Sequence, residues 1–258
     1  MTGMERLLSF YNSTAPETMQ AAIVRRILSH VRQIGDMTIY DLSELCYTSP
    51  ASISRLVRKL GYKNFAYFQK DISDCVEKYD RHNRLVSPEH KPEEKSMREY
   101  FFQTLEELYE SFKQSLDEEK INELVQMMHD AEKVAIYSYS VYLIELFLQS
   151  DLFMDGKICD VHQQEKDIFE HIKTLSEKDA VILVAPAAEE GLPVEKLIRQ
   201  IHASKAKVCL ITESRKTAKN GGADLNIVLP GIHMATDMFI IQLFLGVTDM
   251  AYREKYME

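Results

Sequence analysis

The strongest constraint on the fold is an alternation of short apolar runs with helical patterns in the second half of the chain. Consecutive parallel strands cannot be joined by a tight turn, so each needs a crossover, which is usually a helix. We therefore predict a parallel sheet with helices on both faces. The expected strands are 133–139, 157–161, 180–185, 206–212 and 225–230, and the expected helices lie near 96–116, 117–131, 141–154, 164–176, 193–204 and 233–256.

A different pattern precedes this alternation. Residues 1–82 show helical spacing throughout, and the segment NRLVSPEHKPEEKS at 83–96 interrupts it with two prolines and mixed charges. Such a composition is typical of a linker. We therefore expect a helical domain at 1–82, a linker at 83–96 and the α/β domain at 97–258.

Capping signals divide the helical domain. Thr14, with Glu17 three residues later, predicts the start of a helix that continues until Gly35. Its apolar face is expected to contain Ile23, Ile27, Val31 and Ile34.

Two shorter helices should follow. Thr38 with Asp41 at the third helical position predicts one start, and Ser49 with Pro50 at the first helical position predicts the next. Gly61 is expected to end the second of them. Its inward face would consist of Ile53, Leu56, Val57 and Leu60.

The outward face of that helix has an unusual charge. Residues 48–70 contain five Lys or Arg and no acidic residue, although the whole chain has a formal net charge of −9. The charge balance is +3 over residues 1–84 and −12 over residues 85–258. An exposed charged helix face is the simplest interpretation. The missing carboxylates and the small residues at the start of the helix favour a DNA recognition helix instead.

The expected DNA contacts follow from side-chain chemistry. Arg55 would read guanine, Ala51 would touch a thymine methyl group, and Lys63 and Lys70 would contact phosphates. The full set of predicted DNA-binding residues is Ser49, Ala51, Ser52, Ser54, Arg55, Arg58, Lys59 and Lys63.

The stretch YDLSELCYTSPASISRLVRKLGYKNFAYFQKDI resembles the N-terminal helix-turn-helix of the RpiR/MurR family of bacterial transcription regulators. The resemblance rests on a dense pattern, from which Ser43, Tyr47 and Thr48 depart. The matching residues are Leu42, Ser49, Ala51, Ser52, Ile53, Arg55, Leu60, Gly61, Tyr62, Asn64 and Phe65. Members of that family continue with a sugar-isomerase (SIS) domain, and LSEKDAVILVAP, AKVCLIT, GGADLNIVLP and LGVTDMAY are similar to phrases of SIS domains. The resemblance thus implies an all-α helix-turn-helix domain followed by a doubly wound, flavodoxin-like parallel sheet.

SIS domains that bind sugar phosphates usually hold the anion with two small, polar turns. In this chain the first turn keeps only the hydroxyls of Ser138 and Ser140, because it has no glycine. The second turn has Ala185 and Ala187 at the expected serine positions.

The second turn also brings Glu189 and Glu190, whose carboxylates would repel a phosphate. We therefore expect no binding of simple sugar phosphates. Thr212 and Ser214 complete the candidate ligand site, with Arg215, Lys216 and Lys219 nearby. An exposed basic loop is the alternative interpretation of that segment.

Several classes of function find no support in the sequence. The longest apolar run is far too short to span a membrane, and no secretory signal is visible. The four cysteines are widely spaced, and the histidines form no metal-binding pair, so we expect free thiols, no metal and no cofactor.

These observations predict a cytoplasmic transcription regulator that controls carbohydrate-related genes. It would bind a palindromic double-stranded operator as a homodimer or higher homo-oligomer, since a twofold dimer presents two recognition helices. Its small-molecule effector, if it has one, is unknown. A sugar-phosphate isomerase or related SIS enzyme is the first alternative, and a regulator whose acidic domain answers to a protein partner is the second.

Overall fold

The computed structural model describes residues 2–79, 85–86, 88–138, 143–185, 193–231 and 237–257. The chain divides into two compact units, Met1–Asn83 and Arg84–Glu258.

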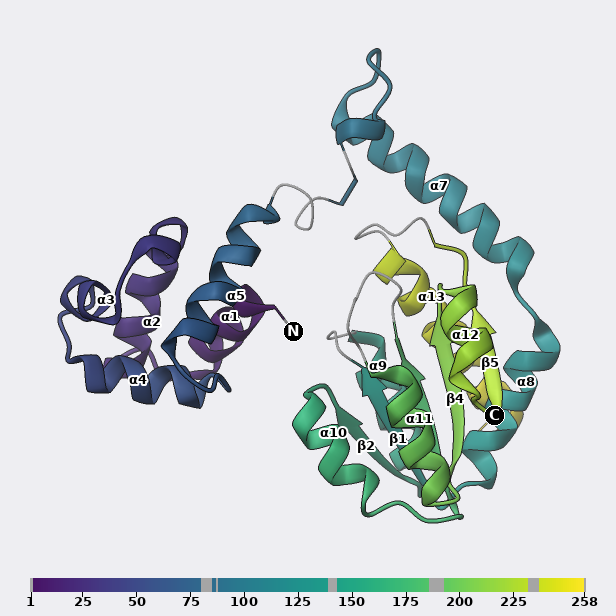
Figure 1. The fold of residues 1–258 in the computed structure, drawn as a ribbon. Coiled ribbons are helices and arrows are strands. Elements are labelled where there is room, and N and C mark those ends of the chain that lie inside the picture. The colour runs from purple at the N-terminus through teal and green to yellow at the C-terminus, as the bar shows by residue number, and fades with distance from the viewer. Residues whose placement is uncertain are drawn as a thin grey trace. The chain divides into compact units, whose positions relative to one another are not determined.

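Every regular element among the described residues of the first unit is a helix (Figure 1). Its core is formed by apolar side chains from every helix, among them Leu7, Ile27, Leu42, Leu56 and Phe68, which are fully or almost fully buried. The helices are α1 (Gly3–Ser13), α2 (Met19–Ser29), the 3-10 helix η1 (Val31–Asp36), α3 (Ile39–Leu45), α4 (Pro50–Lys59) and α5 (Phe65–Glu77).

The predicted start of the second helix was wrong. Thr14 ends α1 instead, and its hydroxyl donates to the Phe10 carbonyl at 2.6 Å. Pro16 disfavours helical geometry at the residue before it, which delays the next helix. Thr18 caps α2 by accepting from the Ala21 amide at 3.1 Å. The α-helix also ends before Gly35, because residues 31–36 tighten into the 3-10 turn η1.

The predicted starts at Thr38 and Ser49 are confirmed. Thr38 and Asp41 form a reciprocal capping box at α3. The Ser49 hydroxyl accepts from the Ser52 amide at 3.2 Å, with Pro50 at the first helical position of α4. Gly61, with φ +90°, follows the end of α4 in a conformation that favours glycine.

The second unit contains one five-stranded sheet, and all its strand pairs are parallel. The strand order is β2-β1-β3-β4-β5, which is the predicted flavodoxin-like order. The strands are β1 (Lys133–Ser138), β2 (Ile158–His162), β3 (Asp179–Val184), β4 (Lys207–Thr212) and β5 (Leu225–Val228).

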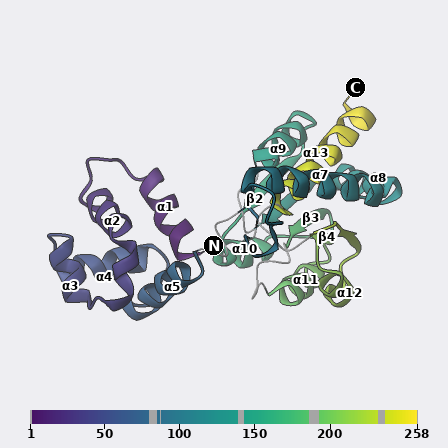
Figure 2. The ribbon, with the colours of Figure 1, turned by 90° about the horizontal axis from the view of Figure 1, so that it is seen from above.

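Helices cover both faces of the sheet, and Figure 2 shows the resulting three layers. The crossover and flanking helices are α9 (Leu143–Met154), α10 (Glu165–Ile172), α11 (Val194–Ala203), α12 (Arg215–Gly221) and α13 (Asp237–Tyr256). Before the first strand lie the 3-10 helix η2 (Pro88–His90), α7 (Met97–Ser115) and α8 (Glu118–Asp130). These bounds confirm the predicted α/β alternation, with one addition at α12.

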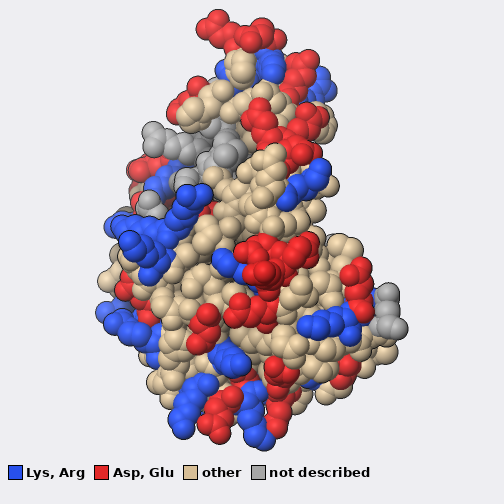
Figure 3. All heavy atoms as spheres, turned by 90° about the vertical axis from the view of Figure 1, so that its right-hand side faces the viewer, with Lys and Arg blue, Asp and Glu red and all other residues tan. Residues whose placement is uncertain are grey.

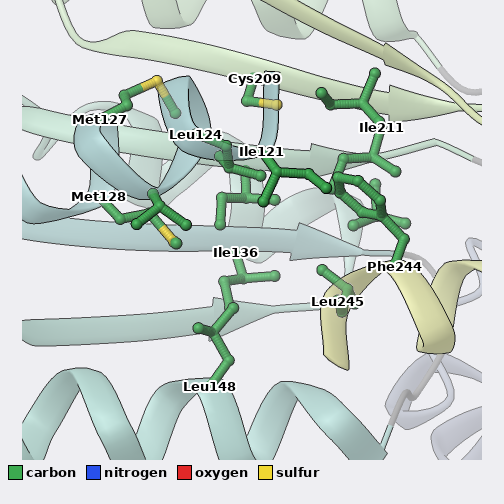
Figure 4. Packing of buried hydrophobic residues seen from close by; sticks show 14 of the residues in the cluster. Ile121, Leu124, Met127, Met128, Ile136, Leu148, Cys209, Ile211, Phe244 and Leu245 are labelled. Carbon is green, nitrogen blue, oxygen red and sulfur yellow. The ribbon is translucent and has the colours of Figure 1, made fainter. Parts of the chain in front are cut away.

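Alternate residues of each inner strand point to opposite faces. Ile136, Ile182 and Ile211 pack with α8, α9 and α13 in one cluster, which Figure 4 shows from close by. Tyr137 and Leu183 face the other cluster, with α10 and α11. Because both faces are covered, the inner strands are apolar on both sides, which explains their continuous apolar runs.

The segment after β4 forms the helix α12 rather than the alternative, an exposed basic loop. Ser214 caps α12 by accepting from the Thr217 amide at 3.1 Å, and Gly222 in the left-handed region (φ +71°) ends it. This helix packs against α11, since a Cβ at Gly221 would lie 3.1 Å from Ile198 Cδ1. No helix in the described parts of the chain has the length and apolarity needed to cross a bilayer.

Candidate functional site

Helices α3 and α4 are joined by a short turn that contains Tyr47 and Thr48. The turn is closed by the Thr48 amide, which donates to the Ser43 carbonyl at 2.9 Å. Tyr47 adopts a left-handed backbone conformation with φ 50°. The buried stripe of α4 contains Ile53, Leu56 and Val57, as predicted, and packs into the core of the first unit.

The opposite face of α4 is exposed and basic. Ala51, Arg55, Arg58 and Lys59 are exposed, and Ser52 and Ser54 are half-buried beside them. The Ser49 and Ser52 hydroxyl oxygens lie 3.0 Å apart, and Arg55 Nη2 donates to Ser52 Oγ at 3.3 Å. The N-terminal end of α4 therefore presents two hydroxyls and a guanidinium together, with no carboxylate on the helix.

The other predicted cations of this unit differ in how they are held. Lys59 Nζ donates to Gln20 Oε1 at 2.8 Å and lies 5.2 Å from the centre of the Phe10 ring, so its ammonium is drawn back toward α1 and α2. Arg58 and Lys63 make no hydrogen bond or ion pair with any residue that the structure describes. Both are exposed, and their charges are available to a ligand.

A further cation beside α4 was missed by the sequence analysis. Arg26, in the last turn of α2, places its guanidinium carbon 4.4 Å from the centre of the Tyr47 ring. The Tyr47 side chain is 81% exposed. Nothing in the spacing of these two residues predicts the contact, since it depends on how α2 packs beside the turn.

Helix α5 holds the segment that precedes α3. Gln69 Nε2 donates to the carbonyls of Ile34, Gly35 and Met37 at 3.2, 2.9 and 2.7 Å. Tyr62, after α4, donates to Asp71 Oδ2 on α5 at 2.6 Å. Burial, and then this bond, raise the pKa of the Tyr62 phenol. These contacts fix α3 and α4 on a rigid base.

In the second unit, the predicted ligand residues lie at the carboxyl ends of strands. Ser138 ends β1 and Thr212 ends β4, and both side chains are fully buried. Thr212 Oγ1 accepts from the Ser214 amide at 3.1 Å, and Ser214 is occupied in capping α12. Ser140, Ala187, Glu189 and Glu190 lie outside the described residues.

Two buried carboxylates also belong to this end of the sheet. Glu213 follows β4 directly and is 8% exposed, and Glu145, in the first turn of α9 after β1, is 2% exposed. The carboxyl ends of parallel strands are where doubly wound folds bind ligands. In this chain two buried carboxylates follow strands at that end, after β1 and after β4.

A chain of hydrogen bonds crosses β1, β2 and α10. The Tyr137 hydroxyl lies 2.8 Å from His171 Nδ1, and His171 Nε2 lies 3.1 Å from Asp160 Oδ2. Burial lowers the pKa of His171, and the bond to Asp160 offsets part of that effect. The neutral ring satisfies both neighbours, because Nδ1 can accept from the phenol while Nε2–H donates to the carboxylate. The His162 ring lies 4.3 Å from that of His171.

An apolar groove of about 500 Å³ opens between α7, α9 and α13. Its wall is almost wholly apolar and includes Leu105, Tyr109, Ile144, Phe147, Phe239 and Leu243. Three of its lining side chains are exposed, Tyr109 (47%), Phe147 (56%) and Leu243 (40%). Exposed apolar side chains that line one groove are typical of an interaction surface.

Surface charge, metal ligands and thiols do not mark a further site among the described residues. On the face drawn in Figure 3, acidic side chains gather in several groups with basic groups between them. Within the described ranges, no group of three or more His, Cys, Asp or Glu side chains is arranged to hold a metal ion. The four cysteines are free thiols, and burial raises the pKa of Cys159 to about 12.

No protein-family model and no curated protein matches the chain. Solved structures do resemble it. The NanR protein of Vibrio vulnificus, in complex with ManNAc-6P, has 16% identity and a TM-score of 0.52, and the match covers 98% of this chain and 92% of that one.

Two further structures resemble part of the chain. The sugar isomerase domain of an RpiR transcription factor from Sphaerobacter thermophilus has 14% identity and a TM-score of 0.55, with 63% of this chain and 92% of that one covered. A proposed phosphosugar isomerase involved in capsule formation from Bacteroides fragilis has 11% identity and a TM-score of 0.50, with coverage of 62% and 91%. The likeness shows the fold alone, a helical region and a five-stranded parallel sheet flanked by helices.

Proposed function

We propose that this protein is a DNA-binding transcription regulator of the RpiR type that acts in the cytoplasm on carbohydrate-related genes. Its first unit reads DNA with α4, and its SIS-type second unit joins two copies. It is not an enzyme, and a ligand other than a simple sugar phosphate acts on the second unit.

The observation that carries the proposal is the outward face of α4. A capped helix begins with two hydroxyls, continues with Arg55 and Arg58, and has no acidic residue, in a chain whose net charge is −9. Small polar residues let the start of a helix enter the major groove, where Arg can donate two bonds to guanine O6 and N7. The match to NanR over both units is consistent with this reading.

The second unit supplies the surface for pairing. The apolar side chains around the groove between α7, α9 and α13 would be covered by the same surface of a second copy, in an isologous contact. Two copies related by a twofold axis present two α4 helices, so the operator is an inverted repeat.

The carboxyl end of the sheet argues against a simple sugar phosphate as effector. Glu145 and Glu213 are buried there, and the second turn has Ala185 where a serine donor is expected. Each lost donor to a charged group removes about 1.5–3 kcal/mol. A carboxylate about 4 Å from a phosphate adds a repulsion of about 1 kcal/mol or more. NanR was solved with ManNAc-6P, and the effector proposed for this chain differs from such a ligand in chemistry.

One observation favours the isomerase alternative. The bonded chain of Tyr137, His171 and Asp160 is the kind of arrangement that could move a proton. However, Tyr137 is fully buried, so its hydroxyl is directed at His171 and not at a ligand. Turnover of a hexose or pentose phosphate that is lost in His171→Gln would establish the alternative.

The test of the proposal is fluorescence anisotropy of the full chain with a labelled pool of random-sequence duplexes. We expect binding that weakens steeply between about 50 and 200 mM salt. The triple variant Arg55→Ala, Arg58→Ala, Lys63→Ala should abolish it, whereas Lys207→Ala, Lys216→Ala, Lys219→Ala in the second unit should not. Absence of salt-dependent binding by the parent, or equal loss in both variants, would refute the proposal.

A further inference from the structure

Tyr47 is in an energetically unfavourable position for its residue type. It adopts φ 50°, where a side chain with a Cβ is disfavoured relative to glycine. Among the described non-glycine residues, only Tyr47 and Lys205 have positive φ. The Tyr47 side chain gains little from burial, because it is 81% exposed. A glycine would adopt this conformation at a lower energy. Packing within the unit therefore does not explain why a tyrosine stands here.

Among the described residues, the Tyr47 ring interacts with a cation, Arg26. The Arg26 guanidinium lies over the ring, with its central carbon 4.4 Å from the ring centre. Arg26 makes no side-chain hydrogen bond and no ion pair with any residue in the described part of the chain. A guanidinium stacked on a ring keeps its N–H edge free, and that edge can bind two phosphate oxygens at once.

The pair also lies where a DNA strand would pass. Tyr47 precedes Ser49, the capping residue of α4, by two residues, which is at most about 7 Å of chain. The phosphates of both strands flank the major groove, so a helix that enters by its N-terminal end brings the preceding turn close to one strand. The adjacent hydroxyls of Ser49 and Ser52, whose oxygens lie 3.0 Å apart, mark the same end.

We propose that Arg26 and Tyr47 form a phosphate-binding subsite that anchors one DNA strand beside α4. The guanidinium binds the phosphate, and the ring holds the guanidinium in place. This inference rests on the proposed DNA binding. It assigns Arg26, a residue of α2, to the interface and explains why the turn tolerates an unfavourable backbone conformation.

The test separates stability from affinity in the full-length protein. Tyr47→Gly relieves the backbone, so the melting temperature should be unchanged or higher, while affinity for duplex DNA falls about fivefold or more. Lys205→Gly is the matched control, since it relieves the other positive φ (66°) in the second unit and should leave DNA affinity unchanged.

The second variant is Arg26→Gln, which should weaken binding to a selected duplex and to an unrelated duplex of equal length by the same factor. The slope of log K against log salt should fall by about one unit. The double variant Arg26→Gln, Tyr47→Gly should lose little more DNA affinity than Arg26→Gln alone. If the parent binds DNA and both single variants bind within twofold of it, the subsite does not exist while the proposed function stands. If the parent binds neither duplex, the proposed subsite and the proposed function are both wrong.

Discussion

Single side chains decide how α4 is presented. The Ser49 cap sets where the helix starts, and the phase of the helix from that point puts Ile53 and Val57 inside and Arg55 and Arg58 outside. Loss of such a cap costs about 1 kcal/mol, a large share of the stability of a small unit. A cation that already makes a hydrogen bond within the unit is less available to DNA. Lys59 makes such a bond, to Gln20, and Lys63 makes none with a described residue.

Lys63 is predicted to bind phosphate without reading sequence. Lys63→Ala should weaken binding to specific and unrelated duplexes alike and reduce the salt slope by about one unit, because one counterion-releasing contact is lost. Anisotropy titrations at several salt concentrations measure both quantities. Lys207→Ala, an exposed cation of the second unit, is the control. An unchanged slope in Lys63→Ala would place Lys63 outside the interface.

At the scale of elements, the packing of α9 against α13 contains a pair of acidic residues. Asp151 on α9 accepts two bonds from Arg253 Nη1, at 3.0 and 2.9 Å. Burial, and then the Asp151 carboxylate, raise the pKa of Asp249 on α13 to about 6. The two helices therefore pack best when Asp249 holds a proton.

This pair predicts a pH dependence with a definite sign. The folded pKa of Asp249 lies above its ordinary 3.8, so the unfolded chain loses that proton first and stability falls as pH rises from about 4 to 6. Asp249→Asn mimics the protonated group. Above pH 6 the free energy of unfolding of Asp249→Asn should be about 2 kcal/mol larger than that of the parent, and this difference should disappear near pH 4. Denaturant unfolding across this range measures the difference.

Glu254→Gln, at an exposed position on the same helix, is the control. Its free energy of unfolding should equal that of the parent at every pH. A constant gap between Asp249→Asn and the parent would mean that Asp249 does not titrate in this window.

Elements differed in how well they could be predicted. The inner strands are apolar on both faces, so their runs marked them to within a residue or two. Helix α12 was missed because RKTAKNG has no apolar stripe and only Gly221 is buried; its signals were Ser214 at the start and Gly222 at the end. The start of α2 was misplaced because Thr14 looked like a cap, although Pro16 follows it.

The candidate sites show the same limit. The outward face of α4 could be predicted, since helix periodicity and a cap determine it locally. The contact between Arg26 and Tyr47, and the chain from Tyr137 through His171 to Asp160, could not. They join residues far apart in sequence, and they depend on helix packing and on the register of β1 against β2.

At the scale of the whole molecule, the two units have complementary roles in the proposal. The basic balance of residues 1–84 suits a polyanion, and the apolar surface of the second unit suits a second copy. Binding at two half-sites by one dimer raises the effective affinity well beyond that of a single reading unit.

The dimer is predicted to use the surface of α7, α9 and α13. Phe147 is 56% exposed and lines the groove, so Phe147→Asp should place a charge in the interface and yield a monomer in sedimentation at micromolar concentration. Met19→Asp, at a more exposed apolar position of the first unit (69%), should remain a dimer. A monomeric parent, or dimers in both variants, would contradict this surface.

Simple sugar phosphates are predicted not to bind the whole molecule. Isothermal titration with glucose-6-phosphate, glucosamine-6-phosphate and ribose-5-phosphate should give no saturable heat at or below ~100 μM. The reason is the acidic end of the sheet, with Glu145 and Glu213 buried there. The double change Ala187→Ser with Glu190→Thr should be needed before any phosphate is held. Saturable heat in the parent would show that Ser138 and the segment from Thr212 bind the anion after all.

The central claim is that α4 reads an inverted repeat as part of a dimer, and selection from randomised duplexes tests it most directly. The full-length parent should enrich a motif with two inverted half-sites whose centres lie about one helical turn, or a multiple of it, apart. Arg55→Ala should enrich a motif relaxed at one base pair in each half, since that contact contributes about 1–3 kcal/mol of discrimination. No enrichment by the parent, or an identical motif from Arg55→Ala, would contradict the account.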